Sequence, residues 1–77
     1  MPRYYFDIIE NDHRSRDREG VDLPSLDDAR REAQEALADM AAEVFRRSEN
    51  ATLTIEIRTE PDGASVEVVA SASIRTN

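Results

Sequence analysis

Six acidic side chains surround the single histidine of the chain, and this group is the first that could do chemistry. Hard divalent cations bind several oxygen ligands, so a concentration of carboxylates can form a cation site. The spacing matches no calcium-binding loop, and arginines alternate with the acids. We therefore interpret the region as a solvated loop and predict no bound metal and no cofactor. The histidine is His13, and the acids are Asp7, Glu10, Asp12, Asp17, Glu19 and Asp22.

Three arginines alternate in the same stretch, at positions 14, 16 and 18. On a β-strand, alternate residues share one side, so these side chains could bind an anion, with Tyr4 or Tyr5 as a stacking partner. Charged residues also protect the edge of a sheet from pairing with other chains. We favour edge protection, because acidic neighbours on both sides lower the local positive potential.

His13 and Ser15 are the residues closest to a general base and a nucleophile. Two positions apart on a strand, they would project on the same side. However, nothing orients His13 and no oxyanion donor suggests itself. A chain of 77 residues is also too small to enclose a water-excluded pocket of ordinary ligand size. The sequence predicts that the protein is not an enzyme, with no catalytic residue and no evident small-molecule substrate.

The composition indicates one small acidic domain over residues 1–77. Apolar residues make up 39% of the chain and charged residues 35%, and the formal net charge is −7. A core of this size supplies about 3–5 kcal/mol net, so self-association that buries more surface is expected. The negative charge disfavours nucleic acids and anionic membranes as partners. With no cysteine, no membrane-length apolar run and no signal-peptide core, we predict a cytoplasmic protein.

The elements that position these residues begin with a helix predicted over residues 25–47. Apolar residues recur every three or four positions from Leu26 to Val44, which places them on one face. Ser25 can accept a hydrogen bond from a first-turn amide, and acidic residues follow it, as the helix dipole favours. Two arginines end the helix and complement its negative end.

Four strands flank this helix in two pairs, because apolar and polar residues alternate there and turn-forming residues separate them. In the first strand Tyr4, Phe6 and Ile8 alternate with Tyr5, Asp7 and Ile9, and the aspartate marks the second set as the outer one. The predicted strands are residues 3–9, 13–17, 51–59 and 65–75.

The predicted fold class is α+β with element order β-β-α-β-β. Two hairpins form a four-stranded, mainly antiparallel sheet, and one long helix packs on one face. The polar second strand belongs at an edge, which leaves the orders 2-1-3-4 and 2-1-4-3 open. We favour 2-1-3-4, because every neighbouring pair is then antiparallel.

One helix covers only one face of the sheet. The opposite face would carry a few apolar side chains among charged and hydroxyl groups, and exposed apolar residues could form a modest dimer patch. Together with the three arginines they form the predicted interaction surface, which consists of Tyr5, Ile9, Val69, Arg14, Arg16 and Arg18.

Several stretches of the sequence resemble one family of small bacterial proteins. They are Met-Pro-Arg-Tyr-Tyr-Phe-Asp-Ile at residues 1–8, Asp17-x-x-Gly20-Val21-x-Leu23-Pro24, Ala29-Arg30-x-Glu32-Ala33, and Ile55-Glu56-Ile57-Arg58 before Pro61-Asp62-Gly63. The family is abundant in rhizobia and related alphaproteobacteria and is classed only as a domain of unknown function. The resemblance implies a cytosolic bacterial protein from a GC-rich genome, and it assigns no activity, ligand or catalytic residue.

The function predicted from the sequence is a small cytosolic protein-interaction module, with a homodimer as one form and an unidentified protein as the other possible partner. The alternative is a weak nucleic-acid-associated regulator that uses the arginines of the first hairpin. Charge layout separates the two. The alternative gains support if folding gathers onto one acid-free surface Arg3, Arg14, Arg16, Arg18 and Arg75.

Overall fold

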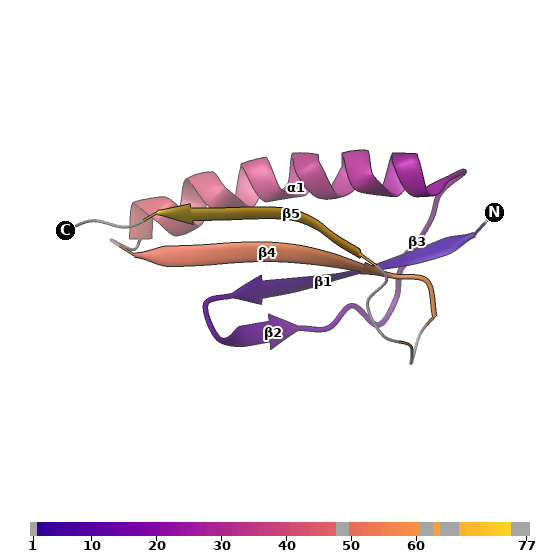
Figure 1. Ribbon diagram of the computed structural model, residues 1–77, viewed down its shortest axis with the longest axis horizontal. Helices are drawn as coiled ribbons and strands as arrows, with labels where there is room; N and C mark the ends of the chain where they lie inside the picture. The colour runs from indigo at the N-terminus through magenta and orange to yellow at the C-terminus, as the bar shows by residue number, and fades with distance from the viewer. Residues whose placement is uncertain (1, 48–49, 61–62, 64–66, 75–77) are drawn as a thin grey trace.

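A computed structural model of the protein describes residues 2–47, 50–60, 63 and 67–74, and in 67–72 and 74 the description is of the backbone. One helix lies along one face of a sheet (Figure 1). This confirms the predicted α+β arrangement, to which the structure adds a two-residue strand, β3. The elements in chain order are β1 (Arg3–Glu10), β2 (His13–Ser15), β3 (Val21–Asp22), α1 (Leu26–Arg47), β4 (Ala51–Arg58) and β5 (Glu67–Ile74).

The strands follow the order β2-β1-β4-β5, and β3 also pairs with β1. Each described pairing is antiparallel, which confirms the order that we favoured. β2 pairs with the C-terminal half of β1, whereas β3 pairs with its first residues. The long strand β1 is therefore bordered on one side by two short strands with a gap between them.

The ends of α1 are stabilised as the sequence predicts. The Oγ atom of Ser25 accepts a hydrogen bond from the amide of Asp28 at 3.3 Å and donates one to its carboxylate at 2.9 Å. At the other end, the guanidinium of Arg46 donates to the carbonyl of Ala42 at 3.0 Å. The bond from the Asp28 amide satisfies a backbone group that the start of a helix leaves without a partner, and the arginine lies at the negative end of the helix dipole.

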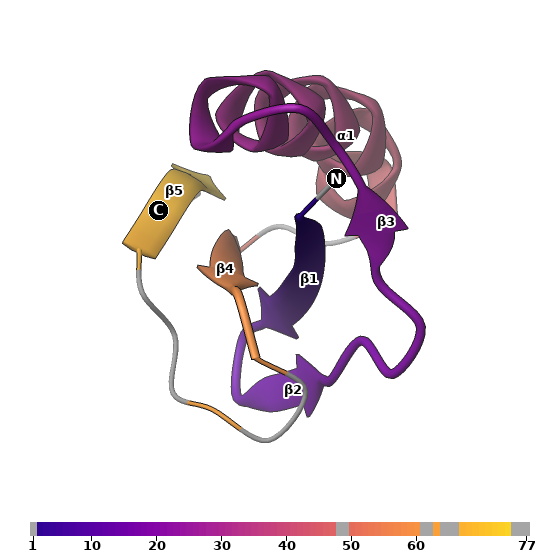
Figure 2. The ribbon, with the colours of Figure 1, turned by 90° about the vertical axis from the view of Figure 1, so that its right-hand side faces the viewer.

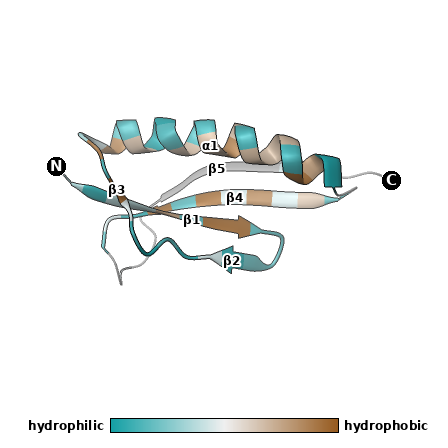
Figure 3. Ribbon diagram, turned by 180° about the vertical axis from the view of Figure 1, so that it is seen from behind, coloured by the Kyte–Doolittle hydropathy of each residue, from teal (hydrophilic) through white to brown (hydrophobic). Residues whose placement is uncertain are grey.

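Apolar side chains fill the space between α1 and the sheet. Leu53, Ile55 and Ile57 of β4 are at most 1% exposed, and burying such a side chain contributes about 1.5–3 kcal/mol. Ala29 and Ala33 of α1 are equally buried, and their small side chains allow the helix to approach the strands closely. The hydropathy colouring places hydrophobic segments in β1 and β4, whereas β2 is hydrophilic (Figure 3).

Two turns hold the strand ends. Asn11 has a φ of 54°, the left-handed conformation that its short polar side chain tolerates. Its amide donates to the carbonyl of Thr52 at 2.9 Å, so the tip of the first hairpin is fastened to β4. After β4, the amide of Gly63 donates to the carbonyl of Glu60 at 3.2 Å and closes the predicted turn. The central residues of that turn, 61 and 62, lie outside the described residues.

An end-on view shows that the sheet curls beneath the helix (Figure 2). β5 lies beside α1 on one side, β3 lies beside it on the other, and β2 lies farthest from it. A β-bulge interrupts the pairing of β4 and β5, where Ile55 pairs with Ala70 but Glu56 pairs with Val68. Val69 is therefore the extra residue of the bulge.

Candidate functional site

The sheet face opposite α1, here called the outer face, is closed where an open surface was predicted. Its residues on β1 and β4 include Tyr5, Asp7 and Arg58, whose exposed fractions are 7%, 1% and 0%. The predicted exposure of Tyr5 is therefore wrong. The reason is the connection between β2 and β3, residues 16–20, which packs over this part of the sheet.

Arg58 is the centre of a buried hydrogen-bond network. Its Nε and Nη2 atoms donate to the two carboxylate oxygens of Asp7 at 2.8 and 3.0 Å, a bidentate ion pair. Nη1 donates to the carbonyl of Glu60 at 2.9 Å, and Nη2 also donates to the carbonyl of Asp17. The guanidinium lies 4.9 Å from the ring centre of Tyr5, within cation–π range. One arginine thus joins two strands and two loops.

Asp17 connects this network to the edge of β1. Its amide donates to the carboxylate of Asp7 at 3.0 Å. Its own carboxylate accepts the amide of Phe6 at 3.1 Å, so a side chain replaces a partner strand in the gap between β2 and β3. The other oxygen accepts the amides of Glu19 and Gly20 at 3.1 and 3.2 Å and shapes the turn. Because Asp17 is used in this way, β2 ends at Ser15 rather than at the predicted residue 17.

Gly20 completes the cover over Tyr5. Its φ is +73°, and a Cβ atom at this position would lie 2.8 Å from Cγ of Arg3 and 2.9 Å from Cε1 of Tyr5. Residues other than glycine rarely adopt this backbone conformation, and Cβ atoms in proteins do not approach their neighbours so closely. The close contact between the loop and the tyrosine ring therefore requires glycine.

The ionisation of the network follows from these contacts. Burial acts to raise the pKa of Asp7, but the hydrogen bond from Arg58, the amide of Asp17 and nearby positive charge outweigh it and hold the pKa below its usual value. Burial also acts to raise the pKa of Asp17, but hydrogen bonds from three backbone amides outweigh this effect and lower the pKa. The hydrogen bonds that Arg58 donates to Asp7 raise the pKa of Arg58. All three groups are charged at neutral pH.

A second arginine separates two carboxylates that face each other across the strands. Asp7 of β1 is the register partner of Glu56 of β4, and like charges directly opposite are destabilising. The Nη1 atom of Arg14 lies 2.8 Å from the Glu56 carboxylate and 3.8 Å from that of Asp7. The hydrogen bond with Glu56 raises the pKa of Arg14. Arg14 therefore neutralises its neighbours.

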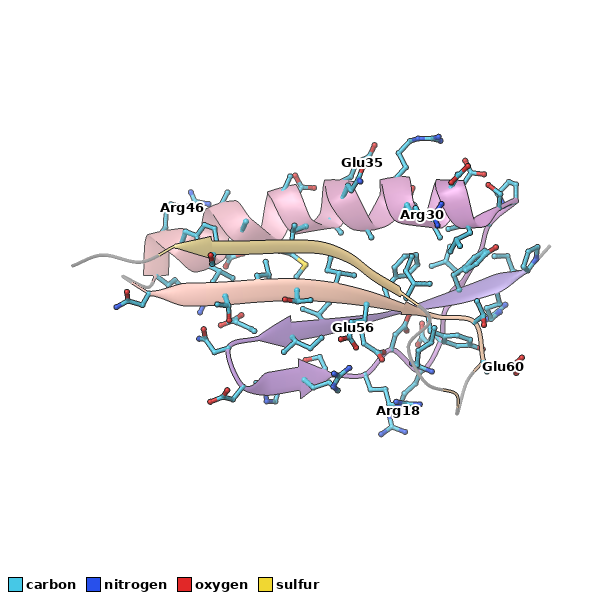
Figure 4. The ribbon with its side chains drawn as sticks, in the orientation of Figure 1. Arg18, Arg30, Glu35, Arg46, Glu56 and Glu60 are labelled. Atoms are coloured by element: carbon cyan, nitrogen blue, oxygen red, sulfur yellow. The ribbon has the colours of Figure 1, made fainter. Side chains whose placement is uncertain are left out.

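The predicted arginine stripe is divided by this arrangement. Arg14 lies on β2, whereas Arg16 and Arg18 lie beyond its end. Arg16 donates to the carbonyl of Gly63 at 3.4 Å, and Arg18 projects away from the body of the protein (Figure 4). Of the apolar residues predicted with them, Ile9 is partly buried between β2 and β4, and the side chain of Val69 lies outside the described part.

The described arginines do not gather on an acid-free surface. Arg3 pairs with Asp22 at 3.1 Å and donates to the carbonyl of Glu19, and Arg14 pairs with Glu56. Arg75 lies outside the described residues. The charge layout therefore adds no support to the nucleic-acid alternative, which stays a prediction.

Four of the six acidic residues of the first hairpin are paired within the chain. Asp7 and Asp17 belong to the buried network, Asp22 pairs with Arg3, and Glu10 lies 3.5 Å from Arg47. Within the part of the chain that the structure describes, no group of three or more His, Cys, Asp or Glu side chains could hold a metal ion. No described helix is long and apolar enough to cross a membrane.

Sequence reasoning missed the roles of Asp17, Gly20 and Arg58. A signal was present, because a lone aspartate in an apolar strand and an arginine on the same face of another strand form a potential buried pair. Which residue covers such a pair depends on the path of a loop, and alternation within strands carries no information about that path.

The comparison with protein families matches residues 3–73 to the family described as Domain of unknown function (DUF6894). The chain belongs to this family. No curated protein and no solved structure matches it. The DUF6894 match confirms the part of the resemblance that concerned a domain of unknown function, whereas the alphaproteobacterial origin stays a prediction. The stretches that carried the resemblance contain the network residues of this chain, which are Tyr5, Asp7, Asp17, Gly20 and Arg58.

The network is suited to holding the DUF6894 fold together. Its carboxylates and guanidinium are buried and occupied by one another or by backbone groups. A group committed in this way is poorly placed to exchange protons or bind a ligand without breaking the contacts that order residues 16–20. The site therefore gives the buried charges of the first hairpin a structural role.

Proposed function

We propose that this protein is a non-catalytic interaction module of the bacterial cytosol, which self-associates by pairing the β5 edges of two copies. The observation that carries the proposal is the contrast between the two edges of the sheet. At one edge, β2 has three residues, all exposed, and bears Arg14. At the other, β5 has eight residues and no charged side chain from 68 to 74.

An edge strand presents unpaired backbone amides and carbonyls that can pair with another chain. Proteins usually prevent this with short strands, charged side chains or proline at the edge. β2 has the first two of these protections, whereas β5 has only the bulge at Val69. The part of β5 beyond the bulge pairs regularly with β4, from Ala70 to Ile74. Among the described strands β5 is the last of the sheet, so this stretch is available for pairing.

A second copy of the chain is the partner that fits this edge. Two identical strands related by a two-fold axis pair antiparallel, which gives a closed dimer with one continuous sheet. Each copy carries a net charge of −7, which opposes approach between most of their surfaces. The uncharged edge is where that repulsion is weakest. A small core also gains most from burying additional surface.

Sedimentation velocity over a concentration series tests the proposal with a matched pair of variants. Ser73 of β5 and Thr52 of β4 are register partners and both are exposed. A lysine at either position adds one positive charge at the same height along the sheet. The two lysines differ in strand, because one lies on the edge strand β5 and the other on its neighbour β4. Each lysine lowers the net negative charge and so weakens the general repulsion between copies. A loss of association in one variant would therefore indicate that its position lies in the pairing interface.

We expect wild type and Thr52→Lys to form dimers and Ser73→Lys to remain monomeric at the same concentration. A wild type that stays monomeric at millimolar concentration, or two variants that behave alike, would contradict pairing through β5.

A further inference from the structure

The helix does not seal the sheet completely on the side of β1. A cavity of about 160 Å³ lies between α1 and the strands and opens beside Val21, which is 46% exposed. Among the described residues, its lining is apolar apart from one glutamate. The apolar residues that define this α1–β1 groove are Phe6, Ile8, Val21, Ala33, Ala36 and Ile55.

The size of the groove suits a single side chain. Apolar cavities of about 150 Å³ bind a benzene ring, whereas sites for drug-sized molecules are about 300–1,000 Å³. One aromatic ring or one branched aliphatic side chain would therefore fill the groove. Side chains of this kind are the anchors that dominate the affinity of many protein interfaces.

A row of acidic residues on α1 begins at the groove and continues along the helix. Glu32 lines the cavity itself. Asp39 and Glu43 follow after about two and three helical turns, and Glu35 lies between, so the four share one side of α1. We call these four residues the acidic ridge. Glu35 projects from the outer side of α1 (Figure 4).

The acidic ridge lacks the compensation that other charges of the chain have. The arginines near the start of α1 pair with Asp27 and Asp28, and Arg47 reaches Glu10. No residue of the ridge makes an ion pair with any described residue. Like charges four positions apart, as in Glu35, Asp39 and Glu43, destabilise a helix. The ridge therefore keeps negative charge beside an apolar opening at a cost to helix stability.

We propose that the α1–β1 groove binds a basic peptide segment of a partner protein, which inserts one large apolar side chain into the cavity and places Lys or Arg against the acidic ridge. Charge complementarity selects this occupant, because no described residue forms an ion pair with the ridge and the whole chain carries −7. A second copy of the chain, equally acidic, is a poor fit for the same surface.

The groove goes beyond the proposed β5 dimer and does not depend on it. β5 and β3 lie on opposite sides of the helix in the end-on view (Figure 2). A peptide beside β3 would therefore leave the β5 edge accessible. The two proposals can fail separately.

Panning a random 12-residue peptide display library on the wild-type protein tests the groove directly. We expect enriched peptides to share a large apolar residue flanked by Lys or Arg. Affinities of a synthetic enriched peptide would then be measured for variants by isothermal titration calorimetry. Ala36→Leu fills the cavity from the helix, so it should weaken binding at least about tenfold. Glu32→Gln should weaken it about two- to fivefold and reduce its salt dependence.

Each variant has a matched control on an exposed position. Ala38→Leu adds the same three carbons to the solvent side of α1, and Asp12→Asn removes one negative charge at the tip of the first hairpin. Both should bind the peptide like wild type. The proposal is overturned if no peptide is enriched, if the enriched peptides lack the apolar anchor or the basic residues, or if Ala36→Leu binds as well as Ala38→Leu. Loss of self-association in Ala36→Leu would overturn it in favour of a second copy in the groove.

Discussion

The two edges of the sheet, at β2 and at β5, differ in charge and in strand length. At the first hairpin, short strands and a loop carry many charges, and several of these charges pair within the chain, through Arg58 and through Arg14. At β5, one continuous strand carries no charge over residues 68–74. The comparison teaches that charge density is a poor guide to binding here. Much of the charge at the first hairpin is used within the fold, and we propose that the uncharged edge strand is the one that pairs with a partner.

The buried pair at the charged end also illustrates how such networks act. Removing two charges from water costs several kcal/mol per ion, and good geometry with additional hydrogen bonds is needed to offset it. The pair of Asp7 and Arg58 has both, since the remaining donors of Arg58 reach backbone carbonyls. Its net contribution to stability is small, whereas the loss of one partner is costly.

Replacing Asp7 with leucine is the substitution with the largest expected effect on this comparison. It leaves the charge of Arg58 buried without its counter-ion, and we expect the free energy of unfolding to fall by about 3–5 kcal/mol. Urea denaturation followed by circular dichroism measures this loss.

The double variant Asp7→Leu/Arg58→Met is its control, because it removes both charges. It should recover most of the lost stability. A single variant that loses less than about 1 kcal/mol would mean that the pair is solvated and the network is not a structural element.

Replacing Gly20 with alanine tests the cover over Tyr5. The new Cβ atom would meet Arg3 and Tyr5 at less than 3 Å in a left-handed conformation, so we expect a loss of about 2 kcal/mol. The near-neutral change expected for an exposed alanine such as Ala38→Ser provides the reference. If Gly20→Ala is equally neutral, residues 16–20 do not pack on the outer face as described.

Acid should lower the free energy of unfolding through the buried network of Asp7 and Asp17. The pKa values of Asp7 and Asp17 are lowered in the folded protein, so the unfolded chain binds protons more tightly. The stability from these groups is complete above their unfolded pKa of about 3.9 and is lost as the pH falls through the lower folded values. Urea midpoints measured from neutral pH downwards should fall below about pH 4. Asp17→Asn should be less stable at neutral pH and show a shallower acid decline, and equal slopes would argue against the assignment.

The exposed ion pairs should matter least. Arg3→Ala removes contacts with Asp22 in which both side chains are about half exposed, and such pairs contribute about 0–1 kcal/mol. Arg14→Ala should cost more than Arg3→Ala, because Asp7 and Glu56 would then face each other without a cation between them. A comparison of thermal midpoints at low salt ranks the two, and the reverse order would contradict the separating role of Arg14.

The sequence was sufficient to predict the helix, four strands and their arrangement, and insufficient to predict that a loop covers part of the outer face. The periodicity from Leu26 to Val44 and the alternation in β1 and β4 depend on local geometry, so they predicted the helix and the long strands. The strand order followed from a polar strand at the edge and antiparallel neighbours, whereas β3 was not predicted. Arg58 and Asp7 were assigned to an exposed face because alternation says which face a residue is on but not whether a loop covers it. Asp17 and Gly20 act through contacts set by the path of residues 16–20, which no local pattern specifies.

The contrast between the two edges is tested most directly by amide hydrogen exchange at low and high protein concentration. Pairing through β5 predicts that outward-facing amides between Ala70 and Ile74 gain protection at high concentration, whereas amides of β2 do not change. Exchange rates in β5 that are independent of concentration, or new protection confined to β2, would contradict the account.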